Sequence, residues 1–466
     1  MTRRVRRVTR LAAIAGIIML VAMGRGAAAY PPPPPPLDLS HLEFVAALPA
    51  GAAPVATQRA LATAHPEAQK ADRAQLDKAV TQQLDLIHAE EEANGNFSKD
   101  LAPELLSLAV LYQQRDDHLL AIPVLERARQ IIRYNEGLYS LDQVPMVERA
   151  LASRDALHDG SVVEQTEDQL LEIARRNPSD ARVADIYYEI ANRHVGTVER
   201  FLSDPSQQEL TVTLSVDGLA PHRETPEETA LTTLDGARDN YAQALRSVVR
   251  HRSPDGPSLG DVEAGLVRSY YIEAQNVNKL SPLAAQTDSR LGKPRYQEGI
   301  RAALHERGVE SYWRRMRFSV KAERPESEIA AEQLELGDWH LLFDDDELAF
   351  ATYRNARLLL ERNGATPEDI QKFFSPTSPT VLPTFIAGFV GADQAAAYRG
   401  YIDVTIALNG VGKSTRSDVT GKSPQTPDEV VHRLKRFVAE SHFRPRFEGD
   451  GWALEDHVSL RYYFTY

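Results

Sequence analysis

The sequence has no cysteine among its 466 residues. Disulfide bonds, thiolate chemistry, cysteine-bound zinc and the lipid-modified cysteine of a bacterial lipoprotein are therefore excluded. Catalytic motifs are also lacking. Neither an H-E-x-x-H zinc pattern nor a G-x-S-x-G nucleophile elbow occurs, and the 13 histidines show no paired metal spacing. We therefore predict no enzymatic activity, no cofactor and no metal site.

Long hydrophobic runs are scarce. The longest, Leu11 to Met23, is shorter than the ~20 apolar residues that span a bilayer. Five arginines precede it within residues 1–10, and Ala27-Ala28-Ala29 follow it. This order is typical of a secretory signal peptide. We predict that residues 1–29 are a signal peptide that is cleaved, leaving no membrane span. The alternative is an uncleaved inner-membrane anchor that faces the periplasm.

Basic residues are outnumbered by acidic ones. The formal net charge is −13, and loss of residues 1–29, which hold six arginines and no acids, would make it −19. A chain this acidic repels nucleic acid as a whole, so we predict no nucleic-acid partner. The hydrophobic share of 42% is that of a globular protein with a substantial core.

The spacing of apolar and chain-breaking residues divides the chain into segments. Pro31 to Pro36 open a Pro/Ala-rich linker predicted over residues 30–58. Residues 59–374 are predicted to be almost entirely helical, because apolar residues recur there with the 3.6-residue period of one helix face. A proline-containing linker is predicted over 375–398, and a separate domain over 399–466.

Two segments of the helical region share one pattern, at relative positions 0, +3, +12, +16 and +19. The first set is Ala109, Tyr112, Ala121, Leu125 and Ala128, and the second is Gly337, His340, Ala349, Tyr353 and Ala356. Small residues at such spacing predict a hairpin of two helices that cross closely.

With these positions, LAVLYQQRDDHLLAIPVLERA and LGDWHLLFDDDELAFATYRNA resemble the tetratricopeptide repeat (TPR). The resemblance implies a solenoid of helical hairpins with a protein-binding groove. More degenerate helices, such as ARVADIYYEIANR, DNYAQALRSVV and VEAGLVRSYYIEA, would complete the stack, because two repeats alone would expose their apolar faces. The number of true repeats stays open.

The stretch IDVTIALNGVGKST at 402–415 resembles a phosphate-binding loop. That motif requires a helix directly after its Lys-Ser/Thr, because the helix N-terminus binds the phosphate. Gly421, Pro424 and Pro427 argue against such a helix, and Ala407 stands where the first glycine belongs. The alternation of residues 401–408 instead predicts a half-buried strand, and Asn409-Gly410 predicts a hairpin turn.

The rest of the tail predicts a return strand at 415–422, a helix at 428–440 and further strands, of which the last covers 458–464. This tail resembles the C-terminal domain of TonB, the periplasmic energy transducer. The resemblance rests on G-Y-I-D-V-T-I at 400–406, F-R-P at 443–445, G-D-G-W at 449–452 and V-S-L-R-Y-Y-F at 458–464. It implies a small α+β domain (strand-strand-helix-strand-strand) that binds partners along a strand edge. The residues we predict to contact a partner are Phe443, Pro445, Trp452, Arg461 and Tyr463.

Other charged stretches receive structural interpretations. Asp344 to Glu347 lack the alternation of a calcium loop and are expected to cap a helix start. Tyr312 to Arg317 are expected to be a packed tryptophan beside a solvated arginine face, with anion binding as the alternative. Asp456 and His457 are neighbours on a strand, so they point to opposite faces and form no dyad.

The sequence thus predicts a mainly α, TPR-like repeat body with a small C-terminal TonB-like domain. The expected function is a periplasmic scaffold or adaptor of a Gram-negative cell envelope, whose protein partners would include an outer-membrane protein. The alternatives are a membrane-anchored, TonB-type energy transducer, and an enzyme or ligand-binding protein with an unrecognised site. The identity of the partner and the oligomeric state are not determined by the sequence.

Overall fold

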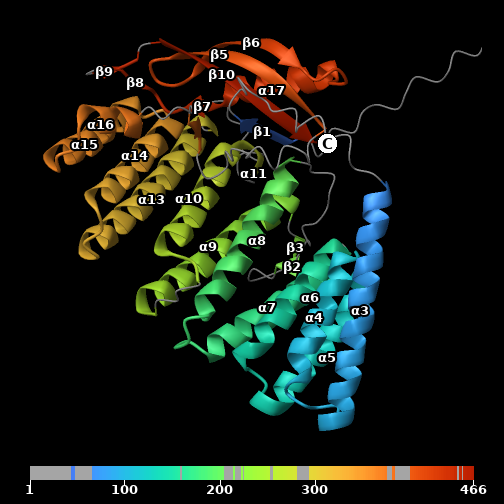
Figure 1. Cartoon of the computed structure of the whole chain (residues 1–466). Helices are drawn as coiled ribbons and strands as arrows, with labels where there is room; N and C mark the ends of the chain where they lie inside the picture. The colour runs from blue at the N-terminus through green and yellow to red at the C-terminus, as the bar shows by residue number, and fades with distance from the viewer. Residues whose placement is uncertain are drawn as a thin grey trace, which may run out of the picture. The chain divides into compact units, whose positions relative to one another are not determined.

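The computed structural model describes residues 43–47, 66–157, 160–203, 214–215, 222–223, 225–251, 256–280, 293–374, 380–383, 399–448, 451–453 and 455–465. The predicted signal peptide, the proline run and most of the predicted linker at 375–398 lie outside these residues. The described chain is mostly helical, with a small antiparallel sheet built largely from its C-terminal part (Figure 1).

The longer helices follow one another along the chain, most of them with short connections. They are α3 (Pro66–Asn94), α4 (Leu101–Gln114), α5 (His118–Glu136), α6 (Val144–Ala156), α7 (Gly160–Arg176), α8 (Val183–Ser203), α9 (Pro226–Arg250), α10 (Leu259–Gln275), α13 (Lys293–Lys321), α14 (Glu326–Leu342) and α15 (Asp346–Arg362). Shorter ones are η1 (Leu141–Gln143), α11 (Val277–Leu280) and α16 (Pro367–Phe374). Capping boxes open two of them, because the side chains of Thr225 and Ser258 accept hydrogen bonds from the backbone of the first turn of α9 and α10.

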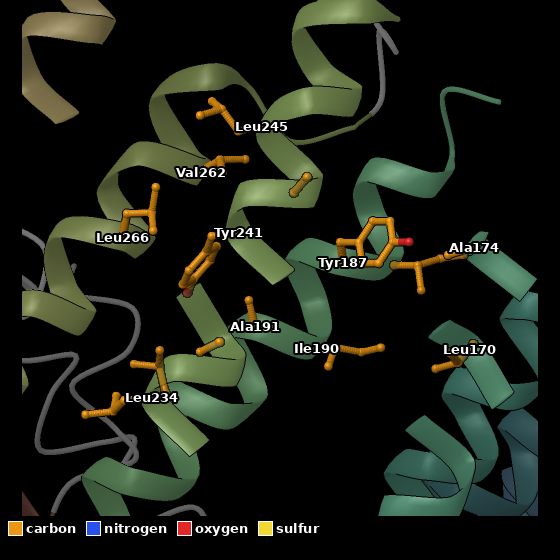
Figure 2. Close-up of a cluster of buried hydrophobic side chains, with 14 of the residues drawn as sticks. Leu170, Ala174, Tyr187, Ile190, Ala191, Leu234, Tyr241, Leu245, Val262 and Leu266 are labelled. Atoms are coloured by element: carbon orange, nitrogen blue, oxygen red, sulfur yellow. The ribbon is translucent and has the colours of Figure 1, made fainter. Parts of the chain in front are cut away.

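The buried apolar side chains form successive clusters along this order of helices. One cluster joins α3 to α6, a second joins α6 to α11, and a third runs from α10 to α16 and includes Leu382. Figure 2 shows the second, in which Tyr241 of α9 lies between residues of α8 and α10. Each helical layer therefore buries the apolar face of the layer before it, as expected of stacked hairpins.

The two segments with matching sequence spacing form hairpins with matching turns. In α4–α5 the Asp117 N–H donates to the Tyr112 carbonyl (2.9 Å), and in α14–α15 the equivalent Asp345 N–H donates to the His340 carbonyl (3.0 Å). The preceding residue is left-handed in both, with φ of 65° at Asp116 and 62° at Asp344. Aspartate adopts this conformation more readily than most residues. The two hairpins thus share one backbone geometry as well as one sequence pattern.

The small residues lie where the helices cross. Their side chains are fully buried at Ala109, Ala121, Ala128, Ala349 and Ala356. At Gly337 the ring of Tyr353 approaches so closely that an added Cβ would lie 2.2 Å from a ring carbon. The Tyr353 hydroxyl donates to Asp338 Oδ1 at 2.8 Å, which fixes the ring in place. Glycine is therefore required at this crossing by space.

Replacing Gly337 with alanine should destabilise the protein by about 2 kcal/mol, since the fixed Tyr353 ring cannot retreat from the new methyl group. The matched control is Gly196→Ala in α8, where an added Cβ meets nothing within 4 Å. That change should stabilise by about 0.5–1 kcal/mol through helix propensity. Urea unfolding followed by circular dichroism measures both. Equal effects of the two substitutions would contradict the close crossing.

His340, at the end of α14, is buried against a second histidine. Its Nδ1 lies 2.9 Å from His305 Nε2 of α13, so one ring donates and the other accepts, with both neutral. Burial lowers the pKa of His340 to about 4, and the neighbouring His305 adds to this, while Asp345 opposes it. Burial lowers the pKa of His305 as well.

This pair predicts a loss of stability in acid. The unfolded chain takes up a proton on His340 below about pH 6.5, whereas the folded chain resists it until about pH 4. The His340 contribution is therefore present above pH 6.5 and lost as the pH falls toward 4, on the order of 3 kcal/mol in total. His340→Gln should flatten the pH profile of the unfolding free energy over this window. His88→Gln, on the exposed face of α3, should leave the profile of the wild-type protein. Identical profiles for all three proteins would refute the assignment.

The C-terminal strands form a sheet, and one helix packs against one face of it. Strand β5 (Gly400–Asn409) pairs antiparallel with β6 (Ser414–Lys422) on one side and with β10 (Glu455–Thr465) on the other. Its residues are alternately buried and half-buried, as in a strand with one face on the core. Helix α17 (Asp428–Glu440) buries Val430, Leu434 and Val438 against the sheet face that carries Ile402 and Leu460. Short strands lie between them: β7 (His442–Phe443), β8 (Phe447–Glu448) and β9 (Gly451–Trp452). The hairpin at Asn409 is as predicted, and strand β6 follows Lys413, where a phosphate-binding loop would need a helix.

One strand comes from a part of the chain where a linker is predicted. Residues Glu43–Ala47 form β1, which pairs antiparallel with Arg461–Thr465 of β10, so the sheet order is β1-β10-β5-β6 (Figure 1). The alternation of EFVAA is too short to separate a strand from a linker in the sequence. Pairing with the edge of β10 supplies the backbone hydrogen bonds that a segment of this length needs. Among the described residues three further two-stranded pairs are β2 (Leu214–Ser215) with β3 (His222–Arg223), β4 (Val381–Leu382) with β7, and β8 with β9.

Candidate functional site

A polar cleft lies among the helices α10, α13 and α14 and has a volume of about 470 Å3. Its charged lining consists of Asp261, Glu263, Glu328, Glu332, Glu335, Arg315 and Arg324. Val267, Ala264, Ala331 and Tyr312 supply an apolar part of the wall. Carboxylates thus outnumber guanidinium groups, and the cleft is acidic. Its volume lies in the range of small-molecule sites and of pockets for single side chains.

Arg315 organises one side of the cleft. Its Nη1 and Nη2 donate to the two oxygens of Glu335 at 2.6 and 3.2 Å, and its Nε donates to Glu332 Oε1 at 3.1 Å. Burial works against the charge of Arg315, but these hydrogen bonds and charges hold its pKa above the ordinary value. Such a paired fork is rigid, so it positions both carboxylates along the cleft wall.

Two carboxylates of the cleft are deeply buried. Glu332 is 3% exposed; its Oε1 also accepts from the Ser319 hydroxyl, whereas its Oε2 accepts no hydrogen bond among the described residues. Glu263 is 2% exposed, and its Oε1 lies 2.8 Å from Arg314 Nε. Burial raises the pKa of Glu263, and the Arg314 charge opposes that rise. A carboxylate kept in such a place is costly unless something completes its hydrogen bonds.

The interpretation of Tyr312 to Arg317 from the sequence is wrong for the packed aromatic residue and for Arg315. Tyr312 is the packed aromatic residue at 8% exposure, whereas Trp313 is 52% exposed. Arg315 is paired with Glu332 and Glu335 and lines the acidic cleft, so it is not part of a solvated face. Arg314, which pairs with Glu263, keeps 45% of its side chain exposed, and Arg317 is exposed, as predicted for that face. The reversal follows from helix phase, because only one of two adjacent residues can face the α14 core.

The five residues predicted to bind a partner lie in two different settings. Phe443 and Pro445 are buried, and Trp452 packs its ring against Phe350, Tyr353 and Phe374 at centroid distances of 5.4, 5.1 and 5.7 Å. These three therefore take part in contacts within the chain.

Arg461 and Tyr463 lie on the half-exposed face of the sheet, opposite α17. The Arg461 guanidinium forms a two-pronged ion pair with Asp403 (2.7 and 3.0 Å) and lies 3.9 Å from the Tyr401 ring centroid. This hydrogen bonding raises the pKa of Arg461 above its usual value. The face is polar and aromatic, with its charges already paired.

The edge of the sheet is partly occupied. Among the described residues β1 pairs with Arg461–Thr465 of β10, and Glu455–Leu460 of the same strand have no strand partner on that side. The opposite edge is β6, which carries charged and small residues and two register shifts against β5. Both features discourage indiscriminate pairing at a sheet edge.

A buried ion pair joins the C-terminal segment to the last helical hairpin. Arg444 donates to both oxygens of Asp338 in α14, with Nε to Oδ1 at 2.8 Å. The side chains are only 10% and 5% exposed. Burial raises the pKa of Asp338, and Arg444 is the main opposing influence. No sequence signal links these residues, because they lie 106 positions apart in unrelated contexts.

The Gly412-Lys413 pair of the apparent phosphate-binding loop has a structural role. Gly412 is left-handed (φ 75°), and an added Cβ would lie 1.7 Å from the Phe443 carbonyl oxygen. Lys413 Nζ lies 2.5 Å from Asp344 Oδ1 in the α14–α15 turn. In the acidic stretch Asp344–Glu347, Asp345 caps α15 by accepting a hydrogen bond from the Leu348 N–H, as predicted.

Neither a metal site nor a membrane span occurs among the described residues. They contain no group of three or more side chains arranged to hold a metal ion. No helix among them is both long and apolar enough to cross a membrane.

Breaking the Asp338–Arg444 pair on one side should cost about 3–5 kcal/mol of stability, because Arg444→Met leaves a buried carboxylate without its cation. The control is Lys413→Met, which removes an ion pair whose side chains are 41% and 56% exposed. Exposed pairs contribute about 1 kcal/mol or less. Urea unfolding of the full chain measures both, and a small loss for Arg444→Met would contradict the buried geometry.

The chain is similar to several solved structures, and one of them is described below. No family model matches the chain, and no curated protein matches it. The solved structure described as the crystal structure of BtubC (BKLC) from P. vanneervenii aligns with a TM-score of 0.31 and 14% sequence identity, over 67% of this chain and 95% of that one.

Proposed function

We propose that this chain is a scaffold or adaptor of the bacterial periplasm that binds protein partners and performs no chemistry of its own. A TPR-like helical body would provide one binding surface and a TonB-like C-terminal domain the other. The observation that carries the proposal is the recurrence of one hairpin geometry, with the same left-handed aspartate and the same turn hydrogen bond, in α4–α5 and α14–α15.

Recurrent hairpins support a binding role through their surfaces. Stacked helical repeats bury only the contacts between neighbouring layers, so grooves between layers stay open to solvent. The acidic cleft among α10, α13 and α14 is such a place. Its charge would select a partner that carries positive charge.

The C-terminal domain supports a second contact. The part of β10 at Glu455–Leu460 that β1 leaves uncovered is long enough to add a strand from a partner. Arg461 and Tyr463 lie in the neighbouring part of β10, which β1 covers, so a strand added at Glu455–Leu460 would lie next to the Arg461 end of that part. The predicted signal peptide and the TonB resemblance support the proposed location in the cell envelope, where an outer-membrane protein would be a partner.

Photo-cross-linking in the native organism tests this function. A photoreactive amino acid at Glu328, on the rim of the cleft, or at Ser459, on the exposed side of β10, should yield covalent adducts with defined envelope proteins. The same residue at Arg362, exposed at the end of α15, is the matched control and should yield none. The adducts should come from the periplasmic fraction, with a chain that begins at Tyr30 by intact mass.

Two results would overturn the proposal. Absence of adducts at both positions from a folded, normally expressed chain would remove the adaptor function. Adducts only with a membrane-bound chain that retains Met1 would favour the anchored energy transducer instead, because that function requires the N-terminal segment as an anchor.

A further inference from the structure

The acidic cleft has more negative charge than its own cations neutralise. Arg315 serves both Glu332 and Glu335, Arg324 lies 3.6 Å from Glu328, and Arg314 contacts Glu263 from outside the lining. Asp261 caps the first turn of α10 through its hydrogen bond from the Ser258 N–H. The whole cluster of five carboxylates thus faces three guanidinium groups, and the cleft keeps a net negative charge.

The second observation is a buried acceptor without a donor. Glu332 Oε2 accepts no hydrogen bond within the described chain, although the residue lines the cleft and is 97% removed from solvent. Arg315 Nε and the Ser319 hydroxyl both donate to the other oxygen, Oε1, and leave Oε2 without a donor among the described residues. A group entering the cleft would have to bring its own N–H donors to complete this carboxylate.

The wall of the cleft suits a cation on an aliphatic stem. Val267, Ala264, Ala331 and Tyr312 line the cleft and offer apolar contact to such a stem. A metal ion fits poorly, because the described residues hold no group of three ligating side chains in metal geometry. The volume of about 470 Å3 admits a group the size of an arginine or lysine side chain.

We propose that the cleft among α10, α13 and α14 binds a guanidinium or primary ammonium group on an aliphatic chain. The group would be an arginine or lysine side chain of a partner or a free organic cation. The first source deepens the proposed adaptor function and rests on it, whereas the second does not. Glu332 Oε2 accepts from the bound cation, and Glu263 and Glu335 supply the surrounding negative charge.

Isothermal titration calorimetry on the full chain tests this with three probes. They are a short acetylated peptide with one arginine, the same peptide with the neutral isostere citrulline, and butylguanidinium as a free cation. We expect the arginine peptide and butylguanidinium to bind once per chain. The citrulline peptide should bind at least about tenfold more weakly, a difference of about 1.4 kcal/mol. Affinity for the cations should fall as salt is raised.

Two variants locate the binding. Glu332→Gln removes the charge that accepts the cation and should weaken binding about tenfold or more. Because that change also disturbs Arg315, a second variant, Ala331→Leu, fills the cleft from α14 and leaves every charge in place. Glu310→Gln, on the exposed face of α13, is the matched control and should bind like the wild-type protein. Thermal unfolding confirms that each variant is folded.

The outcomes separate the cleft from the adaptor function. Equal binding of arginine and citrulline peptides, no binding of either cation, or unchanged binding by folded Ala331→Leu would each overturn the cleft proposal. None of these results bears on cross-linking at Ser459. Binding of butylguanidinium without the peptide supports a site for a free cation and removes the cleft from the adaptor surface.

Discussion

The buried ion pair between Asp338 and Arg444 is the interaction on which the C-terminal half of this structure depends. A carboxylate that is 5% exposed is tolerated only with a close cation and further hydrogen bonds. Arg444 provides the first and the Tyr353 hydroxyl the second. Since Tyr353 also fills the space that Gly337 leaves, and Trp452 packs on that same ring, one carboxylate connects the helical hairpin with the segment before the last strand.

Helix α14, which carries Asp338, is buried on nearly every side, so its polar side chains need partners from neighbouring segments. Glu332 and Glu335 meet Arg315 of α13, His340 meets His305 of α13, and Asp338 meets Arg444. An apolar helix in the same place would pack with less constraint. The polar pairs instead fix the register of α14 against its neighbours, because an unpaired buried charge costs more than a shifted apolar contact.

The acidic cleft is a by-product of the same helix. Where α14, α13 and α10 line the cleft, the carboxylates outnumber the guanidinium groups, and buried carboxylate oxygens of Glu263 and Glu332 have no hydrogen bond among the described residues. Solvent access there lowers the free-energy cost of these carboxylates, and a cleft results. The cleft therefore lies beside the hairpin that contacts the C-terminal segment.

Local sequence signals were sufficient where neighbours along the chain decide the structure. The alternation of residues 401–408 with Asn409-Gly410 predicted the β5–β6 hairpin, and the period of Val430, Leu434 and Val438 predicted α17. The spacing of Ala109 and Gly337 predicted two close helix crossings. In each case the turn chemistry or the helical phase is contained in a few consecutive residues.

The tertiary structure decided what depends on distant residues. It pairs Glu43–Ala47 with β10, turns Tyr312 inward and Trp313 outward, and directs Trp452 onto the helical hairpin. Lys413 meets Asp344 across 69 positions, and Arg444 meets Asp338 across 106. No local pattern encodes such contacts, because a charge or an aromatic ring has the same sequence appearance whether its partner is water or a residue folded against it. The sequence by itself determined the class of the long helices and of the β5–β6 hairpin with α17, because their periods and turns are local. The tertiary structure decided the strand at Glu43–Ala47 and the buried pairings, because these depend on residues far apart in the chain.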